Sequence, residues 1–221
     1  DDVMFAFSVE PQQDATTSAI IQPHSGDWPS FGRDYSSRRY SPANQINRNN
    51  VKNLAPAWHY KSGISASFQA TPIVVDGVMY ISLPYDHVVA LDAKTGKPLW
   101  RYEHHTRKDW VLCCGPANRG VAVGYGKVFI GTVDARLISL NSKTGKVEWD
   151  IDAVDIDIAR EGQDSLDSAD PNSKKKVTGG TGVGIAMAPV VYHDKVIVGI
   201  TGVGYGLHID APREDAPLGA V

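Results

Sequence analysis

The chain has 221 residues, a hydrophobic fraction of 42% and a formal net charge of −3 at pH 7. This composition is typical of a globular domain that is long enough to bury a core, and the near-neutral charge gives no indication of a nucleic-acid partner. No run of about 18 apolar residues occurs, so the sequence predicts no transmembrane helix.

The first residues of the chain are interrupted by Pro, Gln, Thr and Ser, which is typical of a segment that lies on a surface. We expect residues 1–26 to form an N-terminal arm with one short strand near residues 4–9. Residues 27–221 are expected to form the folded domain.

The strongest internal signal is a repeat. Residues 90–100 (ALDAKTGKPLW) recur as residues 139–149 (SLNSKTGKVEW), and residues 76–81 (DGVMYI) match residues 125–130 (YGKVFI) at the same offset of 49. Each copy contains four short β-rich runs separated by tight turns. Four strands in every 40–50 residues or so are typical of the blade of a β-propeller, and no helical period competes with this pattern.

The repeated pattern Asp/Asn-x-x-Thr-Gly-Lys-x-x-Trp has a physical interpretation. Asp92 and Asn141 can accept hydrogen bonds from backbone amides of the turn, and Gly96 and Gly145 can adopt a positive φ. The Trp at the end of the last strand can lie flat between neighbouring blades and bury about 200 Å² of ring surface. The sequence therefore predicts an all-β fold, a β-propeller with tryptophan-docked, four-stranded blades.

A third copy begins at residues 193–198 (HDKVIV), after a polar stretch at residues 155–180 that we interpret as a surface insertion. It is not followed by a third Thr-Gly-Lys-x-x-Trp. Propellers close with about 4–8 blades. We therefore expect the ring to be incomplete in this chain, with the remainder of the propeller supplied by the same or by a second chain.

The two cysteines, Cys113 and Cys114, are adjacent. In a reducing compartment they would be two small buried thiols, whereas in an oxidising one they can pair with each other or with partners. A disulfide between adjacent residues closes a strained ring, which persists only where its surroundings fix it. Composition alone does not decide between these possibilities.

Six segments carry a family resemblance. They are residues 27–36 (DWPSFGRDYS), 39–42 (RYSP), 45–51 (QINRNNV), 54–58 (LAPAW), 70–80 (ATPIVVDGVMY) and 113–120 (CCGPANRG). In this order they resemble the N-terminal portion of the pyrroloquinoline-quinone-dependent (quinoprotein) alcohol dehydrogenases, and the Cys-Cys-x-x-x-Asn-Arg-Gly motif makes the match specific. The resemblance implies a periplasmic or secreted, eight-bladed propeller that holds pyrroloquinoline quinone and a Ca²⁺ or lanthanide ion on its axis.

The resemblance also implies roles for the residues of the cysteine motif. Cys113 and Cys114 would form a vicinal disulfide that covers one face of the quinone ring system. Arg119 would bond to the quinone, because its planar donors suit carboxylates and quinone oxygens.

Further cofactor contacts would come from Gln69, Ala186, Thr201 and Gly202. The family usually has Glu at the position of Gln69 and often has Thr at the position of Ala186. A glutamine can donate to a cofactor carboxylate without repelling it, which predicts that cofactor binding depends less on pH than it would with a glutamate.

The metal site is less well defined in this sequence. The family's metal-binding Glu would fall on Gly204, and Glu214 is a nearby candidate ligand. No catalytic residue is expected in this chain, because the family's Asp base would lie beyond Val221.

Two other patterns have plainer interpretations. The pair His104 and His105 could suggest metal ligands, but no partner has a recognisable spacing, which favours a polar loop near the mouth of the propeller funnel. Residues 202–206 (GVGYG) resemble a nucleotide-binding loop, but no helix is expected to follow them, so a Rossmann fold is not supported.

The resemblance implies an oxidoreductase of the EC 1.1 class. Such an enzyme oxidises an alcohol, polyol or sugar hydroxyl by hydride transfer to the metal-bound quinone and passes electrons to cytochrome c or another acceptor. Two alternatives are a non-catalytic propeller scaffold and a relative that only binds a ligand. The scaffold explains the repeat but not Cys113, Cys114 or Arg119, whereas Gly204 keeps the ligand-binding alternative open.

Overall fold

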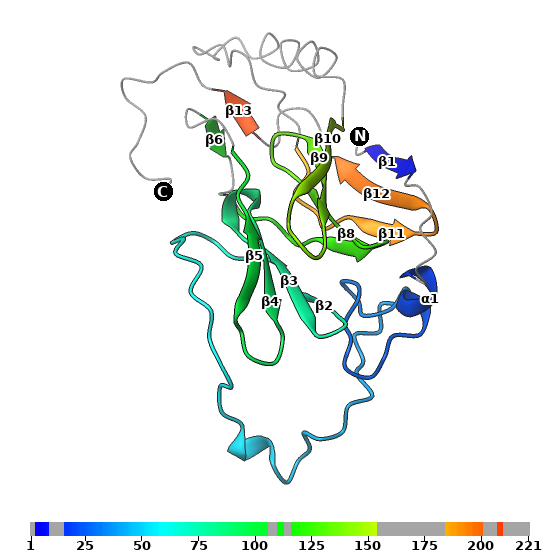
Figure 1. Ribbon diagram of the computed structural model, residues 1–221, viewed down its shortest axis with the longest axis vertical. Helices are drawn as coiled ribbons and strands as arrows, with labels where there is room; N and C mark the ends of the chain where they lie inside the picture. Colours follow the sequence, from blue (N-terminus) through cyan, green and yellow to red (C-terminus); the bar gives the residue numbers. More distant parts are fainter. Residues whose placement is uncertain are drawn as a thin grey trace, which may run out of the picture.

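The computed structural model describes residues 3–8, 16–105, 110–112, 116–153, 184–200 and 207–209. Two four-stranded antiparallel sheets dominate it, each built from strands in chain order (Figure 1). The first consists of β2 (Ile73–Val75), β3 (Val78–Ser82), β4 (Val88–Asp92) and β5 (Pro98–Tyr102). The second consists of β7 (Ala122–Gly124), β8 (Lys127–Gly131), β9 (Arg136–Asn141) and β10 (Val147–Asp152). The two blades predicted from the repeat are therefore confirmed.

A third sheet begins the next unit. In it β11 (Val190–Tyr192) pairs with β12 (Lys195–Ile200), and β1 (Val3–Ser8) lies antiparallel along the other side of β12. The position of β1 agrees with the strand expected near residues 4–9, while the division of the chain at residue 26 stays a prediction. The expected insertion at residues 155–180 lies outside the described residues.

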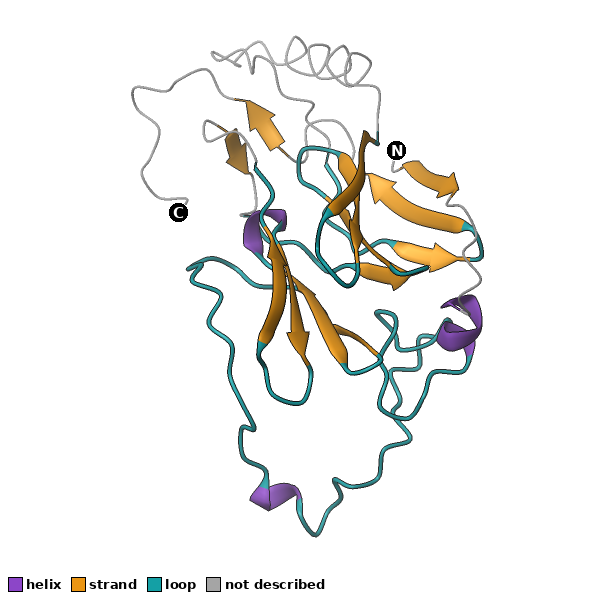
Figure 2. Ribbon diagram, viewed as in Figure 1, coloured by secondary structure: helices purple, strands orange, loops and turns teal. Residues whose placement is uncertain are grey.

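The remaining elements are short. β6 (Trp110–Leu112) pairs with β13 (Leu207–Ile209), α1 spans Thr16–Ile21, and two 3₁₀ turns span Val51–Asn53 and Pro84–Asp86 (Figure 2). Within the described segments, no helix has the length and hydrophobicity needed to cross a bilayer.

Apolar cores lie between neighbouring sheets, because successive side chains of a strand point to opposite faces. In β8, the fully buried Val128 and Ile130 pack in a cluster with Ile73 and Val88 of the first sheet. Phe129, which lies between them in sequence, packs instead in the cluster that includes residues of β11 and β12. The first strands β2 and β11 both contact β7, so the three units converge at their first strands.

The turns of both blades take the predicted form. The side-chain oxygen Oδ1 of Asp92 accepts hydrogen bonds from two backbone N–H groups of its turn, and Oδ1 of Asn141 does the same in the second blade. Gly96 and Gly145 then turn the chain with φ values of +70° and +69°. This left-handed conformation favours glycine.

Each of these glycines lies against a tryptophan ring from the preceding unit. Trp100 of β5 packs on Gly145, and its indole N–H donates to a backbone carbonyl of that turn at 2.8 Å. Trp58 packs on Gly96 in the same way, with an indole hydrogen bond of 3.2 Å. The docking of Trp100 between blades was predicted from the repeat, whereas Trp58 lies outside the repeated pattern and is identified only by the structure.

We predict that Gly145→Ala destabilises the protein more than Gly77→Ala. Both glycines have positive φ, +69° and +76°, so both substitutions carry a backbone cost of about 1–2 kcal/mol. A methyl group on Gly145 would lie 2.5 Å from ring atoms of Trp100, whereas nothing lies within 4 Å of one on Gly77. The overlap should add about 1–3 kcal/mol, measured as a difference in the free energy of unfolding. Equal losses for the two variants would contradict the docking.

Candidate functional site

Two backbone hydrogen bonds bring the beginnings of three strands together. The N–H of Thr71, just before β2, donates to the carbonyl of Arg119 at 3.3 Å, and the N–H of Arg119, just before β7, donates to the carbonyl of Ala186 at 3.1 Å. Ala186 leads in turn into β11. The structure therefore makes Arg119 and Ala186 direct neighbours and places Gln69 two residues from the same junction.

The junction is tight at Gly120. This residue has φ +142°, and a methyl group on it would lie 3.3 Å from the side chain of Ala188 and 3.4 Å from the carbonyl of Thr71. The Asn-Arg-Gly motif thus places glycine at a close approach of the segments that begin β2, β7 and β11.

The side chain of Arg119 is available for a ligand. It is exposed, and among the described residues its guanidinium has neither an ion-pair partner nor a hydrogen-bond partner. It also borders an apolar hollow of about 270 Å³ whose other lining residues carry no charge. Those lining residues include Phe31, Tyr35, Val121 and Met187.

The other residues that the resemblance assigns to the cofactor divide into two groups. Gln69 is exposed and Ala186 is half-buried, both at the junction of the first strands. The remaining candidates lie outside the described residues: Cys113, Cys114, Thr201, Gly202, Gly204 and Glu214. The vicinal disulfide and the metal ligands therefore stay predictions.

A buried polar network includes Asn118, the residue before Arg119, and was not predicted from the sequence. Asp86 is fully buried, and its two carboxylate oxygens accept hydrogen bonds from the side-chain amide of Asn118 at 2.8 Å and from the N–H of Val133 at 2.9 Å. The same amide also donates to the carbonyl of Gly131, and its oxygen accepts the N–H of Gly120 at 2.9 Å. Asn118 belongs to the cysteine motif, which was the available signal for this network.

His104 belongs to the same region and lies in the loop after β5, as expected, but the contacts of its ring were not predicted. Its side chain is buried, and Nε2 lies 3.0 and 3.1 Å from the carboxylate oxygens of Asp134, while Nδ1 lies 3.3 Å from the hydroxyl of Tyr102. His105 is exposed, as expected for a loop. His104 is buried because Asp134, thirty residues further along the chain, supplies a partner for its ring.

Burial and charge act on this network in opposite directions. Burial raises the pKa of Asp86 to about 6, although the hydrogen bonds from Val133 and Asn118 lower it. Burial alone would lower the pKa of His104, but the hydrogen bond to Asp134 and its charge raise it overall. Burial alone would raise the pKa of Asp134, yet the His104 interactions hold it below its usual value.

Ligand atoms of Asp86, His104 and Asp134 lie within 4.8 Å of one another. Both oxygens of Asp86 already accept protein donors, and Asp134 accepts His104 and the hydroxyl of Thr132. The network is therefore satisfied by its own hydrogen bonds, and we assign no ion to it.

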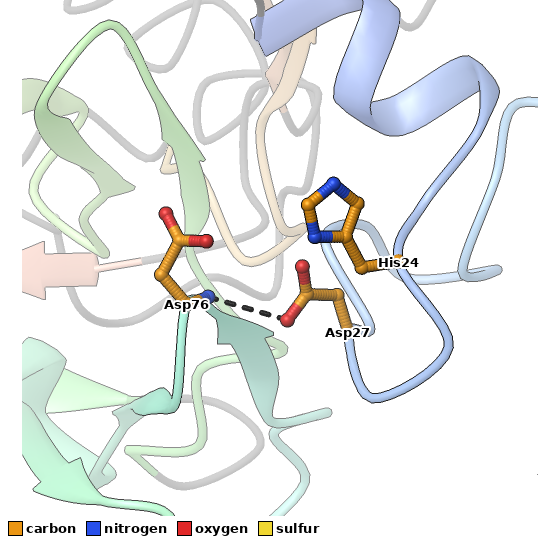
Figure 3. A group of neighbouring side chains, drawn as sticks. All are labelled: His24, Asp27 and Asp76. Carbon is orange, nitrogen blue, oxygen red and sulfur yellow. Dashed lines mark hydrogen bonds between the residues drawn. The ribbon is translucent and has the colours of Figure 1, made fainter.

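A second group of this kind is exposed and lies at the far end of β2. His24 and Asp27 face Asp76 of the β2–β3 turn, and Oδ1 of Asp27 accepts the N–H of Asp76 at 3.2 Å (Figure 3). The guanidinium of Arg33 holds the same loop by donating to the carbonyls of Asp27, His24 and Pro23. These contacts fix the N-terminal loop on the hairpin, away from the junction at Arg119.

We predict that the effect of His104→Gln on stability depends on pH. Because folding raises the pKa of His104 above 6.5, its contribution is complete below pH 6.5 and is lost as the pH rises through the folded pKa. The variant should be less stable than wild type by about 1–3 kcal/mol below that pH, with a smaller difference at higher pH. The measurement is the free energy of unfolding of both proteins across this range. A difference that does not change with pH would show that His104 and Asp134 are not an ion pair.

Comparison with known proteins agrees with this architecture. Residues 28–217 match the family model described as the glucose/ethanol/alcohol dehydrogenase β-propeller domain. The dehydrogenase subunit of an alcohol dehydrogenase (quinone) from Gluconacetobacter polyoxogenes is 40% identical over 181 residues, which are 79% of this chain and 24% of that protein.

Two solved structures are also similar. Quinohemoprotein alcohol dehydrogenase ADHIIG from Pseudomonas putida HK5 matches with a TM-score of 0.68 and 37% identity, over 84% of this chain and 24% of its own. A europium-containing methanol dehydrogenase matches with a TM-score of 0.66 and 32% identity, over 82% of this chain and 28% of its own. The chain thus spans about a quarter of the length of the relatives it matches. It belongs to the β-propeller family of the glucose, ethanol and alcohol dehydrogenases, and its two four-stranded sheets are blades of that propeller.

Proposed function

We propose that the protein containing this chain is a quinoprotein dehydrogenase that oxidises a hydroxyl of an alcohol, polyol or sugar. Its cofactors would be pyrroloquinoline quinone and a Ca²⁺ or lanthanide ion. The observation that carries this proposal is the guanidinium of Arg119, which has no partner among the described residues and lies at the junction of three first strands in a chain of this dehydrogenase family.

The described residues fit such a cofactor. Pyrroloquinoline quinone is a flat ring system with carboxylates and two adjacent carbonyls, so it needs both a cation and an apolar surface. Arg119 offers charged donors that have no partner in the described part of the chain, and the hollow beside it is apolar. Gln69 is exposed two residues before Thr71 of this junction, and its amide can donate without adding a negative charge.

When bound, the quinone supplies the redox chemistry by accepting hydride from the alcohol. The chain's own contribution is to bind and orient: Arg119 and Gln69 donate hydrogen bonds, and a Cys113–Cys114 disulfide would offer a flat face for stacking. The catalytic base and the ligands of the metal are expected from residues outside those described.

The same proposal covers the wider assembly. A vicinal disulfide needs an oxidising compartment, which supports a periplasmic or secreted location. The quinohemoprotein name of a relative supports a cytochrome as electron acceptor. The remaining blades would complete the ring, and a small-molecule alcohol or sugar would enter it.

The test uses the full-length protein with pyrroloquinoline quinone and either Ca²⁺ or a lanthanide. Quinone absorbance follows binding, and reduction of an artificial dye follows turnover on a panel of alcohols and sugars. Stoichiometric binding with turnover is expected. Binding without turnover would indicate a ligand-binding protein, and no binding in a sample with an intact Cys113–Cys114 disulfide would indicate a scaffold.

We predict that Arg119→Ala weakens quinone binding by about 10- to 100-fold, the usual loss for a hydrogen bond to a charged group. The matched control is Arg38→Ala, which removes an exposed guanidinium paired with Asp34 at 3.2 Å. Binding measured by absorbance titration should be unchanged in the control. An Arg119 variant with wild-type affinity would remove the main support for the proposal.

We also predict that Gln69→Glu makes quinone affinity more sensitive to pH. The new carboxylate would repel a cofactor carboxylate once it ionises, so affinity should fall between about pH 5 and pH 8 more steeply than in wild type. Titrations at several pH values compare the two proteins. Identical pH profiles would place Gln69 away from the cofactor.

A further inference from the structure

Asp86 occupies a costly position that the function proposed above does not use. It is fully buried, and both it and Tyr85 have a positive φ, 59° and 64°. A carboxylate is expensive to bury, and a non-glycine residue in this backbone conformation is strained by about 1–3 kcal/mol. Such costs persist only where the surrounding structure fixes them, and they concentrate at functional sites.

The contacts of Asp86 show what it holds. Its oxygen Oδ1 accepts the side-chain amide of Asn118, and the N–H of the preceding Tyr85 donates to the carbonyl of Pro116 at 2.9 Å. The 3₁₀ turn Pro84–Asp86 is therefore fastened to the cysteine-motif segment at two points. Asn118 in turn fixes the backbone of Gly120, because its side-chain oxygen accepts the N–H of Gly120.

Arg119 lies between the two residues that this chain of hydrogen bonds fixes. Its carbonyl and N–H are also used, by Thr71 and Ala186. The backbone from which its guanidinium projects is thus held on both sides, while the guanidinium itself has no partner among the described residues.

We infer that Asp86 is a positioning residue for the cofactor, which acts through Asn118 to set the backbone position of Arg119. Asp86 would not touch the quinone. The inference rests on the proposed function, since it assumes that Arg119 binds the quinone.

The side-chain chemistry provides a precise test. In Asp86→Asn, one carboxylate oxygen becomes an NH₂ donor. In either orientation of the new amide, this donor faces another donor, the amide of Asn118 or the N–H of Val133. In Asn118→Asp, a carboxylate faces the carboxylate of Asp86. The exchange Asp86→Asn with Asn118→Asp restores a donor opposite an acceptor between the two side chains, while at the carbonyl of Gly131 an acceptor oxygen replaces the amide donor.

The experiment measures the equilibrium affinity of the full-length protein for pyrroloquinoline quinone by absorbance titration, together with the thermal unfolding of each variant without cofactor. Each single variant should bind about 10-fold more weakly, and the exchange should recover to within about 3-fold of wild type. Asp150→Asn, which breaks the exposed ion pair with Arg136, is the control and should bind like wild type.

The outcomes are separable. If the wild-type protein binds the quinone and the single variants bind it with equal affinity, only this inference is overturned. The same holds if the exchange variant binds no more tightly than the single variants. A wild-type protein that binds no quinone would overturn the proposed function as well. If the Asp86→Asn and Asn118→Asp variants do not fold, Asn118→Gln provides another test. It keeps the same donor and acceptor on a longer side chain and should also weaken quinone binding about 10-fold. Wild-type affinity in that variant would contradict the inference.

Discussion

The backbone of Arg119 is the constraint on which the rest of the site depends. Its carbonyl accepts from the segment that begins β2, and its N–H donates to the segment that begins β11, so one residue links three consecutive units. Because both main-chain groups are used in this way, only the side chain remains for a ligand. The position of the site is therefore a consequence of how the first strands of the blades converge.

Three kinds of contact hold the blades together. At the Thr-Gly turns, tryptophan rings rest on Gly96 and Gly145, where a larger side chain would overlap the ring. Between the sheets, alternate residues of strands such as β8 fill the two cores. Near Arg119 the contacts are polar: Asp86 pairs with Asn118, and His104 pairs with Asp134. Apolar packing gives the blades their stability, while the polar contacts determine the precise geometry where a ligand would bind.

Much of the fold could be predicted because its strands and turns follow local sequence patterns. The 49-residue offset, the Asp-Gly hairpin at residues 76–77 and the Thr-Gly turns correctly gave two four-stranded blades and the docking of Trp100. Trp58 escaped prediction because it precedes the first complete copy of the repeat and follows no Thr-Gly-Lys turn. Gly96 belongs to the repeated turn, but no pattern in the sequence pairs it with a tryptophan 38 residues earlier.

The site was less predictable for the same reason. Family resemblance led to Arg119, Ala186 and Gln69, and the structure brings these residues to one junction. The network behind them draws Asp86, His104, Asn118 and Asp134 from separate loops at irregular spacings, so no periodicity marks it. His104 illustrates the limit, since the sequence predicts its loop, whereas its burial depends on a carboxylate thirty residues further along the chain.

The central claim is that the junction at Arg119 is one wall of a quinone site. A crystal structure of the full-length protein with pyrroloquinoline quinone tests it most directly. The account predicts the guanidinium of Arg119 about 3 Å from a quinone oxygen or carboxylate, with the sulfur atoms of Cys113 and Cys114 against one face of the ring. A quinone bound elsewhere in the propeller, with the Arg119 side chain in solvent, would contradict it.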